Sequence, residues 1–221
     1  GVWPAVLIWP DIMGLRPAFR RIGQRLAKSG YTVLVPNLYY RVQTAPVVSE
    51  NFSFANPQDR EAIFSLRDTL TDTHVVRDSK ALVEFLRGTS MTASCQIGVL
   101  GYCLGGGFAY RTAAVMPKDV GVVASFHGSD LAPTSVVSPH RHVNATKASY
   151  LVQIAKNDDA ADPEVKSKLA SAFDLANLSA RIDICDANHG WCVEGSNAYN
   201  PREADLAWSR LEAVLSHTLH E

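Results

Sequence analysis

The sequence lacks an excess of charge of either sign. Its 221 residues carry 21 Lys and Arg against 22 Asp and Glu, which gives a formal net charge of −1 at pH 7. No block of like charge stands out along the chain. Proteins that bind nucleic acid or anionic membrane surfaces through charge carry a basic face or run. The sequence therefore argues against both nucleic acid and membranes as partners, and it does not indicate the oligomeric state.

Long apolar runs are also missing. None approaches the roughly 20 residues that a membrane-spanning helix requires, and no secretory signal is visible. Hydrophobic residues still make up 47% of the chain and charged residues 19%, which is typical of a protein with a large core. We expect one domain over residues 1–221. Because a predicted core strand follows Gly1 almost at once, we also expect an N-terminal edge hairpin to be missing from this sequence.

Cysteine is scarce, with only Cys95, Cys103, Cys185 and Cys192. No two of them have the Cys-x-x-Cys spacing of zinc or redox sites, and the histidines show no metal-ligand spacing. We therefore expect no metal and no other cofactor. A chain of this size with a full core needs no disulfides, so reduced thiols and a cytoplasmic location are predicted.

Apolar runs alternate with helix-compatible segments along the chain. This alternation predicts an α/β fold whose central, mostly parallel sheet is covered by helices on both faces. Two long irregular segments, Leu38–Pro57 and Leu131–Lys147, are expected to shape a pocket. The predicted strands are Ala5–Trp9, Tyr31–Val35, Gln96–Leu100, Gly121–Phe126, Tyr150–Ile154 and Ala180–Cys185. The predicted helices are Arg16–Ser29, Gln58–Leu70, Thr73–Leu86, Phe108–Val115, Pro163–Ala176 and Arg202–His220.

The strongest motif is Gly-Tyr-Cys-Leu-Gly, centred on Cys103, which lies between a predicted strand and a predicted helix. This is the context of a nucleophile elbow, with Cys in place of the usual Ser. Glycines flank such a nucleophile because its backbone adopts a strained conformation. A helix N-terminus beside the thiol favours the thiolate. The motif predicts Cys103 as a nucleophile.

Two further polar loops follow predicted strands. Asp158 and Asp159 come after one, and His189 comes after the next. The chain order nucleophile, acid, histidine is that of the α/β-hydrolases, and the carboxyl ends of parallel strands lie along one edge of the sheet. We predict a triad of Cys103, His189 and Asp158, with Asp159 as the less favoured alternative for the acid.

A hydrolase of this type also needs donors for the oxyanion of the tetrahedral intermediate. The fold places one donor on the residue after the nucleophile and the other on a loop after an early strand. These rules predict the backbone N–H groups of Leu104 and Ile12.

Together these residues resemble the dienelactone hydrolase family (carboxymethylenebutenolidases) of the α/β-hydrolase superfamily. The resemblance covers nearly the whole chain and is carried by Asp11–Leu15, Gly30–Tyr39, Gly101–Gly106 and Asn188–Gly190. It implies a cysteine hydrolase that opens enol lactones such as dienelactone through an acyl-enzyme. It also implies that Asp11 helps to generate the thiolate, although the first characterised family members carry Glu at that position.

The resemblance further implies arginines that bind a substrate carboxylate. Spacing points to Arg60, with Arg41 and Arg67 as alternatives, but no arginine follows His189 before Arg202, unlike in the family. Tyr39, His127 and Trp191 are candidates for a differently shaped substrate pocket. A broader carboxylesterase or thioesterase therefore stays open as an alternative function, as does a non-hydrolytic thiol sensor that uses Cys103.

Overall fold

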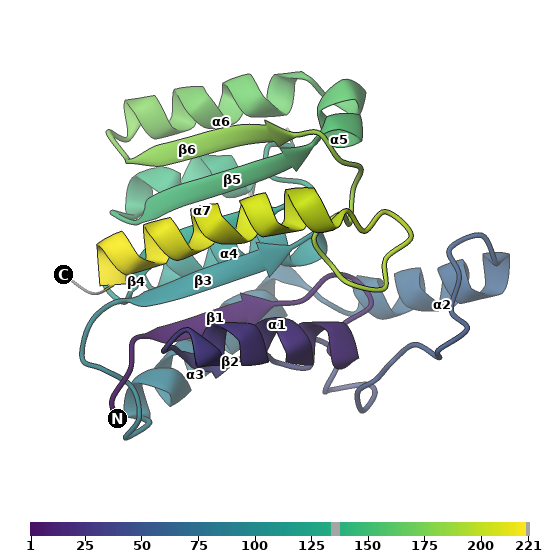
Figure 1. Ribbon diagram of the computed structural model, residues 1–221, viewed down its shortest axis with the longest axis horizontal. Helices are drawn as coiled ribbons and strands as arrows, with labels where there is room; N and C mark the ends of the chain where they lie inside the picture. Colours follow the sequence, from purple (N-terminus) through teal and green to yellow (C-terminus); the bar gives the residue numbers. More distant parts are fainter. Residues whose placement is uncertain (134–137, 220–221) are drawn as a thin grey trace.

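In a computed structural model, which describes residues 1–133 and 138–219, the chain forms a six-stranded sheet with helices on both faces (Figure 1). The strands are parallel and lie in the order β2-β1-β3-β4-β5-β6. The fold class predicted from the sequence is confirmed. The strands span β1 Ala5–Trp9, β2 Thr32–Leu34, β3 Ile97–Tyr102, β4 Val120–Phe126, β5 Ser149–Ala155 and β6 Ala180–Cys185.

Two hydrophobic cores lie on opposite faces of the sheet. One packs against α1 and α7, and the other against α3, α4 and α6. The inner strands β1, β3 and β4 are buried along their whole length, which explains their near-continuous apolar sequences. The helices are α1 Pro17–Lys28, α2 Pro57–Asp68, α3 Asp72–Gly88, α4 Leu104–Val115, α5 Lys156–Ala161, α6 Glu164–Leu175 and α7 Pro201–Leu219, with a 3₁₀ helix, η1, over Pro139–Ala145.

Two helices differ from the sequence-based expectations. The helix α4 begins at Leu104 rather than Phe108, since close packing of its glycines against β1 and β3 outweighs their low helix propensity. The segment with Asp158 and Asp159 forms the short helix α5 instead of a loop. The predicted loop Leu131–Lys147 contains η1, and its residues 134–137 lie outside the described part.

The parallel strands all end on the same side of the molecule, where α2, α5 and the loops after β1, β3 and β4 gather (Figure 1). In open α/β sheets this edge is where ligands bind. No helix in the described part of the chain is long and apolar enough to cross a membrane.

Candidate active site

Cys103 lies at the tip of a sharp turn between β3 and α4. Its φ of 52° and ψ of −119° are unusual for a residue with a side chain. The turn holds this conformation because its backbone segments are in close contact. A Cβ atom on Gly101 would come within 2.0 Å of the Gly105 carbonyl oxygen, and one on Gly105 within 2.4 Å of the Trp9 oxygen. These contacts explain the glycines on both sides of Cys103.

Asp158 lies directly against His189. Its Oδ2 atom is 2.7 Å from Nδ1 of His189. The loop after β6 is tied to α5 by two more hydrogen bonds. The backbone N–H of His189 donates to the side-chain oxygen of Asn157 at 2.7 Å, and the N–H of Lys156 donates to the carbonyl of Ala187. Asp159 instead faces Lys166, at 3.7 Å. The structure therefore brings Asp158, and not Asp159, to His189.

Electrostatics favour a protonated His189. Burial lowers the pKa of this imidazole, but the hydrogen bond to Asp158 and the interactions with Cys103 outweigh it and raise the pKa to about 10. Cys103, His189, Asp11 and Ile12 line one cavity of about 380 Å³, which we call the reaction cavity. A positively charged imidazole in the same cavity as a thiol stabilises its thiolate form.

His127 also borders the reaction cavity, although it is almost completely buried. Its ring centroid lies 4.7 Å from that of His189 and 5.1 Å from that of Trp191. Burial and the neighbouring His189 lower the pKa of His127 well below its ordinary value. A neutral ring here packs against His189 without competing for the thiolate.

The predicted oxyanion donors come from two different parts of the fold, α4 and the loop after β1. Leu104 is the first residue of α4, and the first N–H groups of a helix have no partner within the helix. The side chain of Cys103 does not cap them. Ile12 lies on the loop after β1 and lines the reaction cavity. Sequence reasoning did not anticipate Ser129, whose Oγ atom is 3.5 Å from the sulfur of Cys103.

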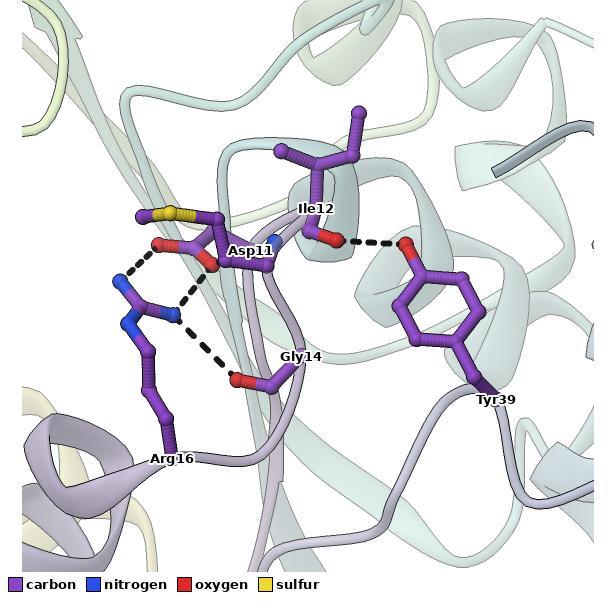
Figure 2. A network of polar contacts seen from close by, with 6 residues as sticks. Asp11, Ile12, Gly14, Arg16 and Tyr39 are labelled. Carbon is purple, nitrogen blue, oxygen red and sulfur yellow. Dashed lines mark hydrogen bonds and ion pairs between the residues drawn. The ribbon is translucent and has the colours of Figure 1, made fainter. Parts of the chain in front are cut away.

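The loop after β1 is held by a network of polar contacts (Figure 2). Arg16 binds both carboxylate oxygens of Asp11, at 2.6 and 2.7 Å, and donates to the Gly14 carbonyl at 3.3 Å. Oδ1 of Asp11 also accepts from the N–H of Met13 at 3.0 Å. The Asp11 carboxylate, expected to meet Cys103, is thus engaged on both oxygens by Arg16.

The remaining predicted substrate contacts are not brought to the reaction cavity. Trp191 is fully buried beside His127, and Tyr39 is buried with its hydroxyl on the Ile12 carbonyl. Arg60 is exposed on α2 and is absent from the cavity's described lining. Arg41 is paired with Asp78 and Arg67 with Asp68. Tyr39 and Trp191, predicted to line a substrate pocket, are therefore core residues. Residue type alone does not reveal on which side of a loop an aromatic ring packs.

Known proteins resemble this chain over most of its length. The model of the dienelactone hydrolase family matches residues 1–219. The chain belongs to the dienelactone hydrolase family. Within this family it is 27% identical, over 204 residues, to the carboxymethylenebutenolidase of Rhodococcus opacus, a match that covers 86% of this chain and 75% of the relative.

Solved structures show the same fold. A crystal structure from Klebsiella pneumoniae named "Putative Dienelactone Hydrolase" has a TM-score of 0.81 at 22% identity, and covers 98% of this chain and 88% of that one. The dienelactone hydrolase from Anabaena variabilis has a TM-score of 0.64 at 21% identity, with 99% and 88% covered. The chain accordingly has the fold of these dienelactone hydrolases.

Proposed function

We propose that this protein hydrolyses enol lactones such as dienelactone through an acyl-enzyme on Cys103. The observation that carries the proposal is the convergence of a thiol on a strained elbow with a His189–Asp158 pair joined at 2.7 Å, both beside one cavity. A nucleophile, a base and a group that orients the base are the parts that covalent acyl transfer requires.

In the first half-reaction the Cys103 thiolate attacks the substrate carbonyl carbon, forming a C–S bond. The carbonyl oxygen becomes an oxyanion, which accepts hydrogen bonds from the N–H groups of Ile12 and Leu104. Collapse of this intermediate breaks the C–O bond of the ester, and His189 gives its proton to the departing oxygen. In the second half-reaction His189 takes a proton from water, the hydroxide attacks the thioester, and the thiolate leaves as the acid product forms.

Leaving-group chemistry narrows the substrate. A thiol has a pKa of about 8.5 in general, far below that of an alkyl alcohol. The tetrahedral intermediate from an alkyl ester therefore expels the thiolate, and nothing is hydrolysed. An enolate or phenolate is a good enough leaving group to depart instead. We therefore expect turnover of enol lactones, aryl esters and thioesters, and weak turnover of alkyl esters.

A broader carboxylesterase or thioesterase activity is the second candidate. It is favoured by the described lining of the reaction cavity, which contains no arginine to bind a substrate carboxylate. The same thiol and histidine serve both candidates, so only the substrate range separates them.

The test follows ring opening of a dienelactone by its ultraviolet absorbance. We expect turnover by the wild type and none by Cys103→Ala, with a mass increase on Cys103 in quenched samples. Cys95→Ala is the matched control, because Cys95 is a free cysteine before the opposite end of β3. Turnover of aryl esters and thioesters but not of the dienelactone would favour the second candidate. A folded wild type that hydrolyses none of them would overturn both, and leave a non-hydrolytic thiol protein.

A further inference from the structure

A second cavity of about 250 Å³ has two neighbours of Cys103 in its described lining, and it shares no described lining residue with the reaction cavity. Its described lining includes Leu104, the residue after the thiol, and Ser129, whose hydroxyl contacts the sulfur. Its walls come from α3, α4 and the segment around η1. We call this cavity the α3–α4 cleft. Leu104 and Ser129 thus place the wall of the cleft next to the nucleophile.

Part of the lining of the α3–α4 cleft is apolar. Leu70, Val75 and Phe108 contribute side chains to it. On α4 the lining also includes Gly107, where an added Cβ would meet nothing closer than 3.7 Å. Unlike Gly105, Gly107 is not required by the backbone, and glycine within a helix is less stable than alanine. Its missing side chain keeps the cleft open.

The far end of the α3–α4 cleft is polar. Arg111 forms an ion pair with Asp72 at 2.6 Å, but its Nε atom is buried and has no hydrogen-bond partner in the described structure. The Nε2 atom of His142, on η1, is likewise buried without one. The Nε–H of Arg111 is always a donor, and Nε2 of His142 is one in the tautomer that carries the proton there. Buried donors without partners are unfavourable, and an acceptor oxygen on a ligand would satisfy both.

The geometry also decides which part of a substrate the cleft receives. The departing oxygen must reach His189 to take its proton, and His189 lines the reaction cavity but is not among the described residues of the α3–α4 cleft. The group in the cleft therefore stays attached to the carbonyl carbon. Leu104 and Arg111 are two helical turns apart, so a chain of about 10 Å spans the cleft.

We propose that the α3–α4 cleft is the acyl-binding subsite of this hydrolase, and that it selects acyl groups with an apolar body and an acceptor oxygen at the far end. Arg111 and His142 recognise that oxygen, which belongs either to a carboxylate or to a neutral carbonyl. This inference rests on the proposed function, since it assigns a substrate class to the same nucleophile.

The test compares four 4-nitrophenyl esters. One is the acetate, which is too short to reach the cleft. The other three have eight-carbon acyl groups that end in a methyl, a methyl ester or a carboxylate. We expect kcat/KM to be higher for the two oxygen-ended chains than for octanoate. The one of these two with the higher kcat/KM shows whether the recognised oxygen belongs to a carboxylate or to a neutral carbonyl. Equal values for all three long chains would overturn the acceptor part of the proposal.

Two variants address the cleft itself. Gly107→Val fills it and should lower kcat/KM for all long chains roughly tenfold or more relative to the acetate. Gly88→Val is the matched control, because Gly88 lies at the end of α3 with open space around it. Arg111→Met should lower kcat/KM only for oxygen-ended chains, also about tenfold. Arg87→Met is its matched control, because it removes a comparable ion pair, with Asp119, elsewhere on α3.

Acetate hydrolysis separates the two proposals. Its absence in folded wild type counts against the proposed function, and a Gly107→Val protein with an unchanged chain-length profile counts against the cleft.

A binding measurement needs no turnover at all. Titration calorimetry with octanedioate and with its monomethyl ester should show that at least one of them binds to the wild type and to Gly88→Val, and that neither binds to Gly107→Val. Equal binding to all three would overturn the subsite.

Discussion

The hydroxyl of Tyr39 donates a hydrogen bond of 2.6 Å to the carbonyl oxygen of Ile12 (Figure 2). The next N–H along the chain, that of Met13, donates to Asp11. The peptide between Ile12 and Met13 is therefore held from both of its ends. Because the preceding peptide carries the N–H of Ile12, this network orients the proposed oxyanion donor without contacting the substrate.

The variant Tyr39→Phe tests this positioning role. It removes one buried hydrogen bond, at an expected stability loss of about 1 kcal/mol. We expect kcat to fall roughly tenfold with KM nearly unchanged, because loss of a whole oxyanion donor lowers kcat about 100-fold or more and this variant only loosens one. Steady-state kinetics with an aryl ester measure both constants.

Tyr110→Phe provides the matched control for Tyr39→Phe. Tyr110 is equally buried, but its hydroxyl has no hydrogen-bond partner in the described part of the chain. Its removal should leave kcat and stability close to the wild-type values. A Tyr39→Phe enzyme with wild-type kcat, or one whose loss is matched by Tyr110→Phe, would contradict the positioning role.

The ion pair between Arg16 and Asp11 should be essential for the stability of the loop. Both side chains are about nine-tenths buried. Arg16→Met leaves the Asp11 carboxylate buried without its charged partner, and removal of one partner from a buried pair destabilises by about 3 kcal/mol. The double variant Asp11→Asn/Arg16→Met leaves no unpaired charge, so it should unfold at higher denaturant than Arg16→Met alone.

Chemical denaturation of the wild type, both single variants and the double variant gives the coupling energy of the pair. The same proteins address the expectation that Asp11 helps to generate the thiolate. If Arg16 holds Asp11 in place throughout the reaction, Asp11→Asn should slow iodoacetamide labelling of Cys103 only slightly. A large loss of labelling in a stable Asp11→Asn protein would show that the carboxylate acts on the thiol.

The strands and the three polar loops that converge were predictable because their signals are local. A buried parallel strand reads as an apolar run, and the polar residues after β3, β5 and β6 must meet at one edge. The helix α5 was missed because its Lys-Asn-Asp-Asp sequence is also typical of a turn. Its contacts with the loop of His189 come from residues about 30 positions away.

The packing of individual side chains was less predictable. Nothing in the spacing of Asp11 and Arg16 distinguishes a free acid from a paired one, since no periodicity applies in a loop. The α3–α4 cleft also left no signal in the sequence. It depends on which of three neighbouring glycines the backbone requires, and only the contacts of Gly105, Gly106 and Gly107 in the folded chain separate them.

The protonation of His189 gives a pH-dependent test of the site. Its pKa in the folded protein, about 10, lies above the ordinary 6.5. The interactions that favour the imidazolium therefore stabilise the fold fully below pH 6.5, and this contribution is lost as the pH rises through about 10.

NMR of the imidazole carbon-bound protons should show His189 titrating near the upper value. Asp158→Asn and Cys103→Ala should each lower its pKa, because each removes an interaction that raises it. Asp159→Asn should leave the titration unchanged, since Asp159 faces Lys166 instead. Titration of His189 near 6.5 in the wild type would contradict the charged imidazole on which the proposed thiolate depends.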